Sequence, residues 1–118
     1  MDGSLSMKNK VFLVPFPFDD LSATKVRPAV CLTSEIKPYR HLVVAFITSQ
    51  VSTNPAPTDL AILDSDKDFS ATGLKVSSTI RLHRVLTISR AIIRRELGEI
   101  SMIHRAAIKE RLQNLFEI

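Results

Sequence analysis

The apolar residues of this chain fall into short runs of strand length, separated by breaks rich in Pro, Asp, Ser and Asn. Residues 11–16, 28–33 and 42–48 are three such runs, and the third is almost entirely apolar, as expected for a strand covered on both faces. Pro15 and Pro17 cannot donate to a ladder, so the first strand should leave the sheet there. No helical segment between these runs can serve as a crossover, which argues against a parallel α/β fold.

The later part of the chain predicts further strands and a turn. Residues 59–63 form a short strand-like run, and Gly73 is expected at a turn that follows it. From residue 77 to 86, polar and apolar residues alternate with the period of a half-exposed strand. This alternation places Arg81 and His83 on the same face of the strand.

The last segment is predicted to be a helix that begins after Ser101, a residue able to cap it. Apolar residues recur there at helical spacing and should pack on the sheet; they are Ile108, Leu112, Leu115 and Phe116. Five or six short strands followed by one helix predict a mainly β (α+β) fold, a small curled barrel with a C-terminal helix.

Length and composition predict a single domain. A chain of 118 residues that is 45% hydrophobic can bury one core but not two, and we expect the domain to span residues 9–118. Residues 1–8, which include a second methionine, are expected to be a disordered leader or an expression remnant. Cys31 has apolar neighbours and is expected in the core of a protein from a reducing compartment. No apolar run approaches the roughly 18–20 residues that cross a bilayer, so we expect no membrane contact and a cytoplasmic location.

The charge distribution is uneven along the chain. The formal net charge of +4 is compatible with a polyanionic partner but does not require one. Five arginines crowd into residues 81–95, and four aspartates precede them within residues 59–68. This separation is compatible with one positive face, although a solvated surface is the commoner cause of such a run.

Several kinds of site are absent from the sequence. It contains no glycine-rich phosphate loop, no Cys/His spacing of a metal site and no Gly-x-Ser-x-Gly motif. We therefore predict no cofactor and no metal. The remaining polar residues near strand ends are Arg, His, Ser and Thr, which suit the handling of a phosphate group without a metal.

Cleavage of RNA requires a base for the 2′-hydroxyl proton, an acid for the departing 5′-oxygen and donors for the charge on phosphorus. Arg81 and His83 can meet these needs, since they share a strand face and imidazole has an unperturbed pKa of about 6.5. The alternative is that both are ordinary surface residues. Asp20, in a loop rich in aspartate, is a further candidate, and neither His41 nor His104 is assigned to a site.

Residues 11–22 (VFLVPFPFDDLS) and 25–30 (KVRPAV) resemble the opening of MazF/PemK-like toxins, in which a hydrophobic strand and a mobile loop lead to an Arg-Pro pair. Three later segments resemble further blocks of the same family in the same order, namely 47–50 (ITSQ), 57–62 (PTDLAI) and 78–88. The resemblance covers roughly residues 9–117.

The resemblance implies an SH3-like barrel with a C-terminal helix, a symmetric homodimer and a cognate antitoxin as partner. It also implies cleavage of single-stranded RNA without a metal, which leaves a 2′,3′-cyclic phosphate and a 5′-hydroxyl. Arg27 of the Arg-Pro pair and Thr48 after the central strand take the family's catalytic positions. By resemblance, Arg27 stabilises the charge of the phosphorane and acts as the acid, and Thr48 hydrogen-bonds the scissile phosphate.

Arg81 occupies the position of a second catalytic arginine that some members have, whereas His83 stands where those members have an aspartate. His83 is therefore either the general base or only an RNA contact. The resemblance also places the loop of residues 19–25 beside the cleft. Residues expected to bind RNA are Asp20, Thr24, Lys25, Ser49, Gln50, Ser77, Ser78 and Arg84.

Two other functions fit the same barrel. Toxins that inhibit gyrase share the architecture and cut nothing, and a barrel can bind nucleic acid through a basic face without cleaving it. The Arg-Pro loop and the Thr-Ser block favour the ribonuclease, because a gyrase inhibitor does not need them near one another.

Overall fold

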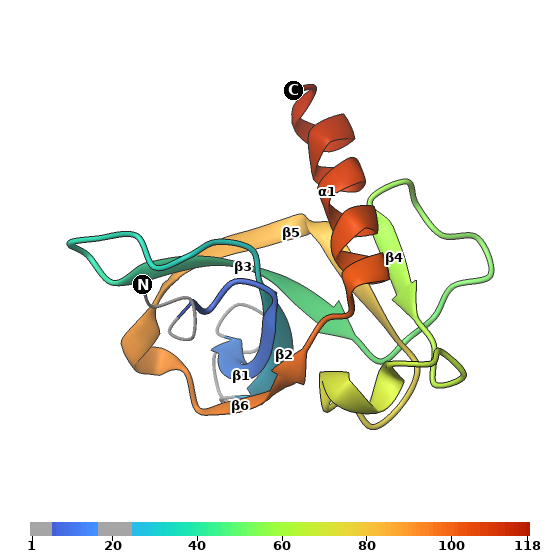
Figure 1. Cartoon of the computed structure of the whole chain (residues 1–118), viewed down its shortest axis with the longest axis horizontal. Coiled ribbons are helices and arrows are strands. Elements are labelled where there is room, and N and C mark those ends of the chain that lie inside the picture. Colours follow the sequence, from blue (N-terminus) through green and yellow to red (C-terminus); the bar gives the residue numbers. More distant parts are fainter. Residues whose placement is uncertain (1–5, 17–24) are drawn as a thin grey trace.

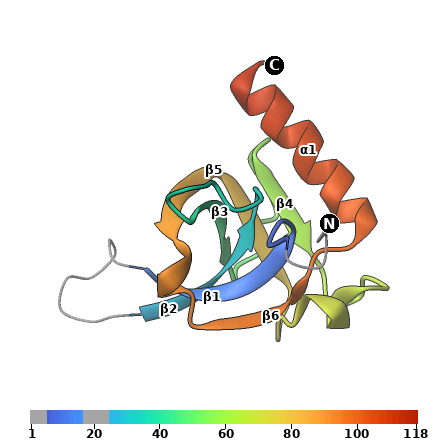
Figure 2. The same cartoon turned by 60° about the vertical axis from the view of Figure 1, so that its left-hand side comes forward.

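The computed structural model describes residues 6–16 and 25–118, which form one antiparallel sheet and a C-terminal helix (Figure 1). The order across the sheet is β4-β5-β3-β2-β1-β6, and the sheet curls into a half-barrel (Figure 2). The predicted mainly β fold with a terminal helix is therefore confirmed. The strands are β1 (Lys10–Phe16), β2 (Lys25–Cys31), β3 (His41–Thr48), β4 (Asp59–Ile62), β5 (Ser78–Ser89) and β6 (Arg95–Glu99).

Strand β2 begins at Lys25, earlier than the predicted start at residue 28, and it carries Pro28 within its length. Its ladder with β1 involves residues 25–30, but its ladder with β3 involves only residues 29–31. Pro28 therefore lies where the ladder with β3 has ended, a position at which a missing N–H donor is tolerated.

Strand β5 extends to Ser89, beyond the predicted end at residue 86, and it is strongly irregular. It pairs with β3 at Ile80 opposite Ile47 and again at Val85 opposite Ala45. Residues 81–84 of β5 consequently stand opposite the single residue between those two on β3. A bulge of this size bends the strand and changes the direction of its side chains.

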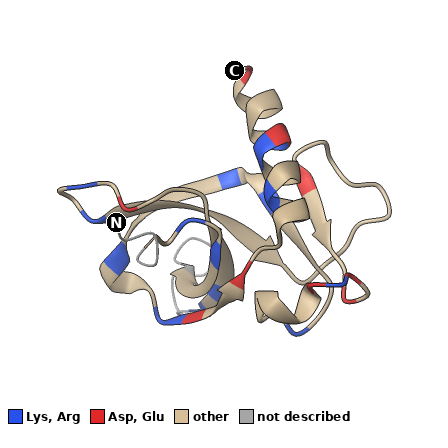
Figure 3. Ribbon diagram, viewed as in Figure 1, with Lys and Arg blue, Asp and Glu red and all other residues tan. Residues whose placement is uncertain are grey.

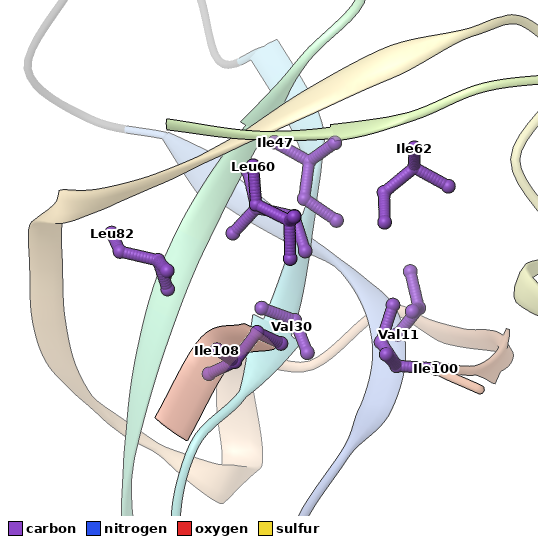
Figure 4. Packing of buried hydrophobic residues seen from close by; sticks show 10 residues of the cluster. Val11, Val30, Ile47, Leu60, Ile62, Leu82, Ile100 and Ile108 are labelled. Atoms are coloured by element: carbon purple, nitrogen blue, oxygen red, sulfur yellow. The ribbon is translucent and has the colours of Figure 1, made fainter. Parts of the chain in front are cut away.

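The sheet buries side chains on both of its faces, as the apolar pattern of the central strands predicts. Residues from five strands, the end of β6 and the helix form the main cluster (Figure 4), which consists of Val11, Val30, Ala45, Ile47, Leu60, Ile62, Ile80, Leu82, Ile100 and Ile108. The second cluster consists of Phe12, Val14, Ala29, Cys31, Leu42, Val44, Phe46 and Ile88. Cys31 is fully buried, as predicted, and burial raises the pKa of its thiol.

Helix α1 (Met102–Phe116) starts where the sequence predicts, because Ser101 Oγ accepts a hydrogen bond of 3.3 Å from the His104 backbone N–H. Ile108 enters the main cluster and Leu112 packs against it. Phe116, in contrast, is 57% exposed, because the end of the helix projects away from the sheet (Figure 1). The prediction that all four apolar residues pack on the sheet is therefore wrong for Phe116.

The segment between β4 and β5 contains the short 3-10 helix η2 (Phe69–Thr72), which packs against β6. Gly73 follows it with φ at 75°, so the predicted turn is confirmed. A Cβ atom at Gly73 would lie 2.1 Å from the backbone oxygen of Leu97 in β6. Strand β6 itself was not predicted as a separate segment, and it is held between this helix and β1.

No helix in the described part of the chain has the length and apolar character that a membrane span needs.

Candidate active site

A pocket opens where strands β2 and β3 separate. Their ladder ends at the pair Ala29 and Phe46, and Arg27 on β2 and Thr48 on β3 both lie beyond that pair. The space between the strands is a pocket of about 270 Å³, called here the Arg27 pocket. Its lining residues are Arg27, Phe46, Ile47, Thr48, Gln50, Arg81 and Arg84.

The Arg27 pocket brings together three arginines that are far apart in sequence. Regular alternation along a strand would send Arg81 and Arg84 to opposite faces of β5. Both line the pocket because they belong to the bulge opposite Phe46. No acidic side chain is found among the described residues of the lining, so the pocket is electropositive and suited to an anion such as phosphate.

The segment that follows β3 is held in place by two hydrogen bonds. The backbone N–H of Gln50 donates to Thr48 Oγ1 over 3.3 Å. The hydroxyl of Thr79 in β5 donates to the backbone oxygen of Gln50 over 2.7 Å, and Thr79 is itself buried. These bonds hold Thr48, the last residue of β3, in the lining of the pocket.

His83 lies on the same strand as Arg81 but is not among the residues that line the Arg27 pocket. The side chain is exposed, and its Nδ1 is 3.1 Å from the hydroxyl oxygen of Thr58. This contact orients the imidazole ring at the side of the sheet on which β4 begins.

The remaining predicted RNA contacts are scattered. Lys25 is exposed at the start of β2, and Ser49 is exposed after β3. Ser77 Oγ accepts a hydrogen bond from the Asp64 backbone N–H, and the buried Ser78 hydroxyl donates to the backbone oxygen of Val76. Neither serine lines the Arg27 pocket. Asp20 and Thr24, with most of the predicted loop, lie outside the described residues.

The Lys and Arg positions are spread over several parts of the ribbon, with Asp and Glu positions among them (Figure 3). Arg90 forms an ion pair of 2.6 Å with Glu35, and Arg40 approaches the same carboxylate at 3.6 Å. The hydrogen bond from Arg90 holds the pKa of Glu35 below its ordinary value. The charge of Arg90 is therefore balanced by a carboxylate near this end of β5, whereas the lining of the Arg27 pocket contains no acid among the described residues.

Sequence reasoning missed two walls of the pocket, Phe46 and Ile47. Both belong to the apolar run of β3, which predicts core residues, and both are indeed almost fully buried. They also line the pocket because β3 is no longer paired with β2 beyond Phe46. Local sequence contains no signal for the position at which a ladder ends.

Within residues 6–16 and 25–118, no three His, Cys, Asp or Glu side chains are grouped as metal ligands would be.

A curled six-stranded antiparallel sheet with one terminal helix and an arginine-lined pocket makes this a small half-barrel protein with an electropositive site. Residues 8–116 match the family described as "PemK-like, MazF-like toxin of type II toxin-antitoxin system", and the chain belongs to this family. The family resemblance seen in the sequence is thus confirmed.

Solved structures show the same fold at low sequence identity. The Mycobacterium tuberculosis toxin MazF-mt6 aligns with a TM-score of 0.70 and 22% identity, over 92% of this chain and 97% of that one. An endoribonuclease in complex with its cognate antitoxin, from Mycobacterial species, aligns with a TM-score of 0.71 and 13% identity over 95% of each chain. A further endoribonuclease from Mycobacterial species has a TM-score of 0.68 and 16% identity, over 97% of this chain and 93% of that one. No curated protein matches the sequence.

Proposed function

We propose that this protein is a metal-independent endoribonuclease that cleaves single-stranded RNA and is neutralised by a cognate antitoxin. The observation that carries the proposal is the presence of Arg27 and Thr48 in one pocket with two further arginines. Family membership supports it, as do the names of two structural relatives as endoribonucleases, one of them bound to its antitoxin. By the same reasoning we propose a cytoplasmic homodimer.

The proposed reaction is transfer of phosphorus from the 5′-oxygen of one nucleotide to the 2′-oxygen of the preceding one. The 2′-hydroxyl loses its proton and its oxygen bonds to phosphorus, the bond to the 5′-oxygen breaks, and that oxygen gains a proton. The products are a 2′,3′-cyclic phosphate and a 5′-hydroxyl. No water or cofactor is consumed in this step.

In this reaction Arg27 donates hydrogen bonds to the phosphoryl oxygens, stabilises the extra charge of the phosphorane and acts as the acid. Thr48 donates its hydroxyl to the same phosphate. Arg81 and Arg84 add positive charge in a partly enclosed pocket, where donors fixed in advance are most effective.

For the base we propose His83. Its Nδ1 is engaged by Thr58, and when Nδ1 carries the proton and donates it to that hydroxyl oxygen, Nε2 has the lone pair that accepts the 2′-hydroxyl proton. His83 is exposed, so a bound RNA strand has access to it.

The proposal predicts that purified protein cleaves a long single-stranded RNA in the presence of EDTA. The new 5′ ends should accept phosphate from polynucleotide kinase without prior phosphatase treatment, and the new 3′ ends should resist a phosphatase until the cyclic phosphate is opened. RNA that stays intact would contradict the proposal. A supercoiling assay with gyrase and an RNA-binding assay then separate the two alternatives.

Replacement of His83 with Ala is expected to lower the cleavage rate by about 10²-fold, the scale for loss of a proton-transfer group, and to change how the rate depends on pH, because a general base acts only in its unprotonated form. The measurement is single-turnover cleavage at a series of pH values. His41→Ala is the matched control, because His41 begins β3 and Thr48 ends it, so the two lie at opposite ends of the strand. A His83→Ala profile with the same shape as the wild-type profile would exclude His83 as the base.

A further inference from the structure

A second pocket adjoins the Arg27 pocket. It has a volume of about 290 Å³ and shares Gln50 and Arg81 with its neighbour. We call it the Asp59 pocket, after its acidic residue. Its lining residues are Gln50, Val51, Ser52, Asp59, Thr79 and Arg81.

Asp59 and Arg81 both line this pocket, and they are direct partners in the register of β4 and β5. Each has one buried polar atom, Asp59 Oδ1 and Arg81 Nε, that makes no hydrogen bond within the described ranges 6–16 and 25–118. A buried donor and a buried acceptor without partners are costly to a folded protein. Such a pair in a pocket wall indicates a ligand that supplies both complementary groups.

Asp59 is otherwise held firmly by its surroundings. Its Oδ2 accepts a hydrogen bond of 3.0 Å from the backbone N–H of Ala56, and its backbone oxygen accepts one of 3.0 Å from Arg111 Nε. The first bond closes the turn before β4, and the second ties the strand to helix α1. These contacts position the carboxylate but leave Oδ1 without a role in the fold.

The charges of the two pockets distinguish their ligands. The lining of the Arg27 pocket has three arginines and no acid among the described residues, so it attracts a phosphate. The Asp59 pocket pairs one arginine with one carboxylate, and the carboxylate repels a second phosphate. A neutral group with adjacent donor and acceptor atoms fits better, and the edge of every nucleobase has such a pair. Val51 offers an apolar surface to the face of the ring.

We propose that the Asp59 pocket receives the base of a nucleotide next to the scissile phosphate, with Asp59 as a specificity-determining residue. Asp59 Oδ1 accepts a hydrogen bond from the donor of the base edge, and Arg81 Nε–H donates to the neighbouring acceptor. A site built to hydrogen-bond its ligand discriminates strongly against ligands that lack the matching group. This inference rests on the proposed ribonuclease function.

The test is Asp59→Asn, assayed on a pool of RNA with random sequence whose cleavage ends are sequenced. Asn keeps an oxygen for the Ala56 N–H, so the turn is retained, but its amide can present a donor where the carboxylate presents an acceptor. We expect base discrimination to fall about tenfold at one position beside the cut and to stay unchanged at other positions, as for loss of a hydrogen bond to a charged group. Asp68→Asn is the matched control, because Asp68 is exposed and its side chain makes no capping hydrogen bond to η2.

The outcomes separate this inference from the proposed function. Wild-type protein that cuts no RNA would contradict the ribonuclease itself. Wild-type protein that cuts with a preference which Asp59→Asn retains at every position would overturn the base pocket alone. An equal loss of rate on all sequences would also overturn it, since Asp59 would then act by positioning Arg81. Equal thermal midpoints of the two variants and the wild type verify that folding is unaffected.

Discussion

Replacement of Arg27 with Ala is expected to lower the rate of RNA cleavage by at least about 100-fold, the scale for loss of one group that stabilises charge in the transition state. Thr48→Ala is expected to cause a loss of similar size, because the Thr48 hydroxyl lines the same pocket. Arg27 comes from β2 and Thr48 from β3, so the two variants test the joint site from both of its strands. The measurement is single-turnover cleavage of a defined RNA at saturating enzyme.

Two comparisons make this prediction specific. Arg40→Ala removes an exposed arginine from the turn before β3, at the opposite end of that strand from Thr48, and should cleave at close to the wild-type rate. Thr48→Ser restores a hydroxyl and should recover most of the activity that Thr48→Ala loses. Wild-type rates in both Arg27→Ala and Thr48→Ala would place the reaction elsewhere on the molecule.

Gly73→Ala is expected to reduce the free energy of unfolding by about 2–5 kcal/mol. Gly73 has φ at 75°, a conformation that costs an L-residue about 1–2 kcal/mol. The added Cβ would also lie 2.1 Å from the Leu97 backbone oxygen, so η2 and β6 must move apart. Urea unfolding measures the loss, and the thermal midpoint should fall by roughly 10 °C or more.

Gly98→Ala separates the cost of the positive φ from the cost of the close contact. Gly98 lies in β6, and its added Cβ would be 2.1 Å from the Ala71 backbone oxygen, but the residue has no positive φ. The Gly98→Ala variant should therefore be destabilised by the close contact alone. Ser70→Ala, an exposed change in η2, should be nearly neutral. Unchanged stability in both glycine variants would mean that η2 does not pack closely on β6.

The sequence pattern was sufficient to predict most of the strands and the helix, because interactions between residues close in the chain determine them. The apolar run of β3 predicts a strand buried on both faces, and Ser101 predicts the start of α1 through its capping hydroxyl. Strand β6 was not predicted because its residues, Arg95–Glu99, are mostly polar. They become a strand because β1 offers them an unpaired edge.

The apolar residues of α1 show the same limit of prediction from local sequence. Ile108 and Phe116 both belong to the apolar residues that recur at helical spacing on α1, yet Ile108 is buried and Phe116 is exposed. Periodicity predicts which face of a helix is apolar. How far the sheet extends beneath that face depends on the positions of β4 and β5, the strands that the helix contacts.

Local patterns and short motifs were sufficient to predict the fold class, the family and the candidates Arg27 and Thr48. The three-dimensional arrangement of the strands decided that β2 and β3 part beyond Ala29 and Phe46, which opens the pocket between the two candidates. It also decided that a bulge brings Arg81 and Arg84 to the same side and that Asp59 is the register partner of Arg81. The register between strands depends on hydrogen bonds that join residues far apart in the chain, and no local periodicity specifies where such a ladder slips or ends.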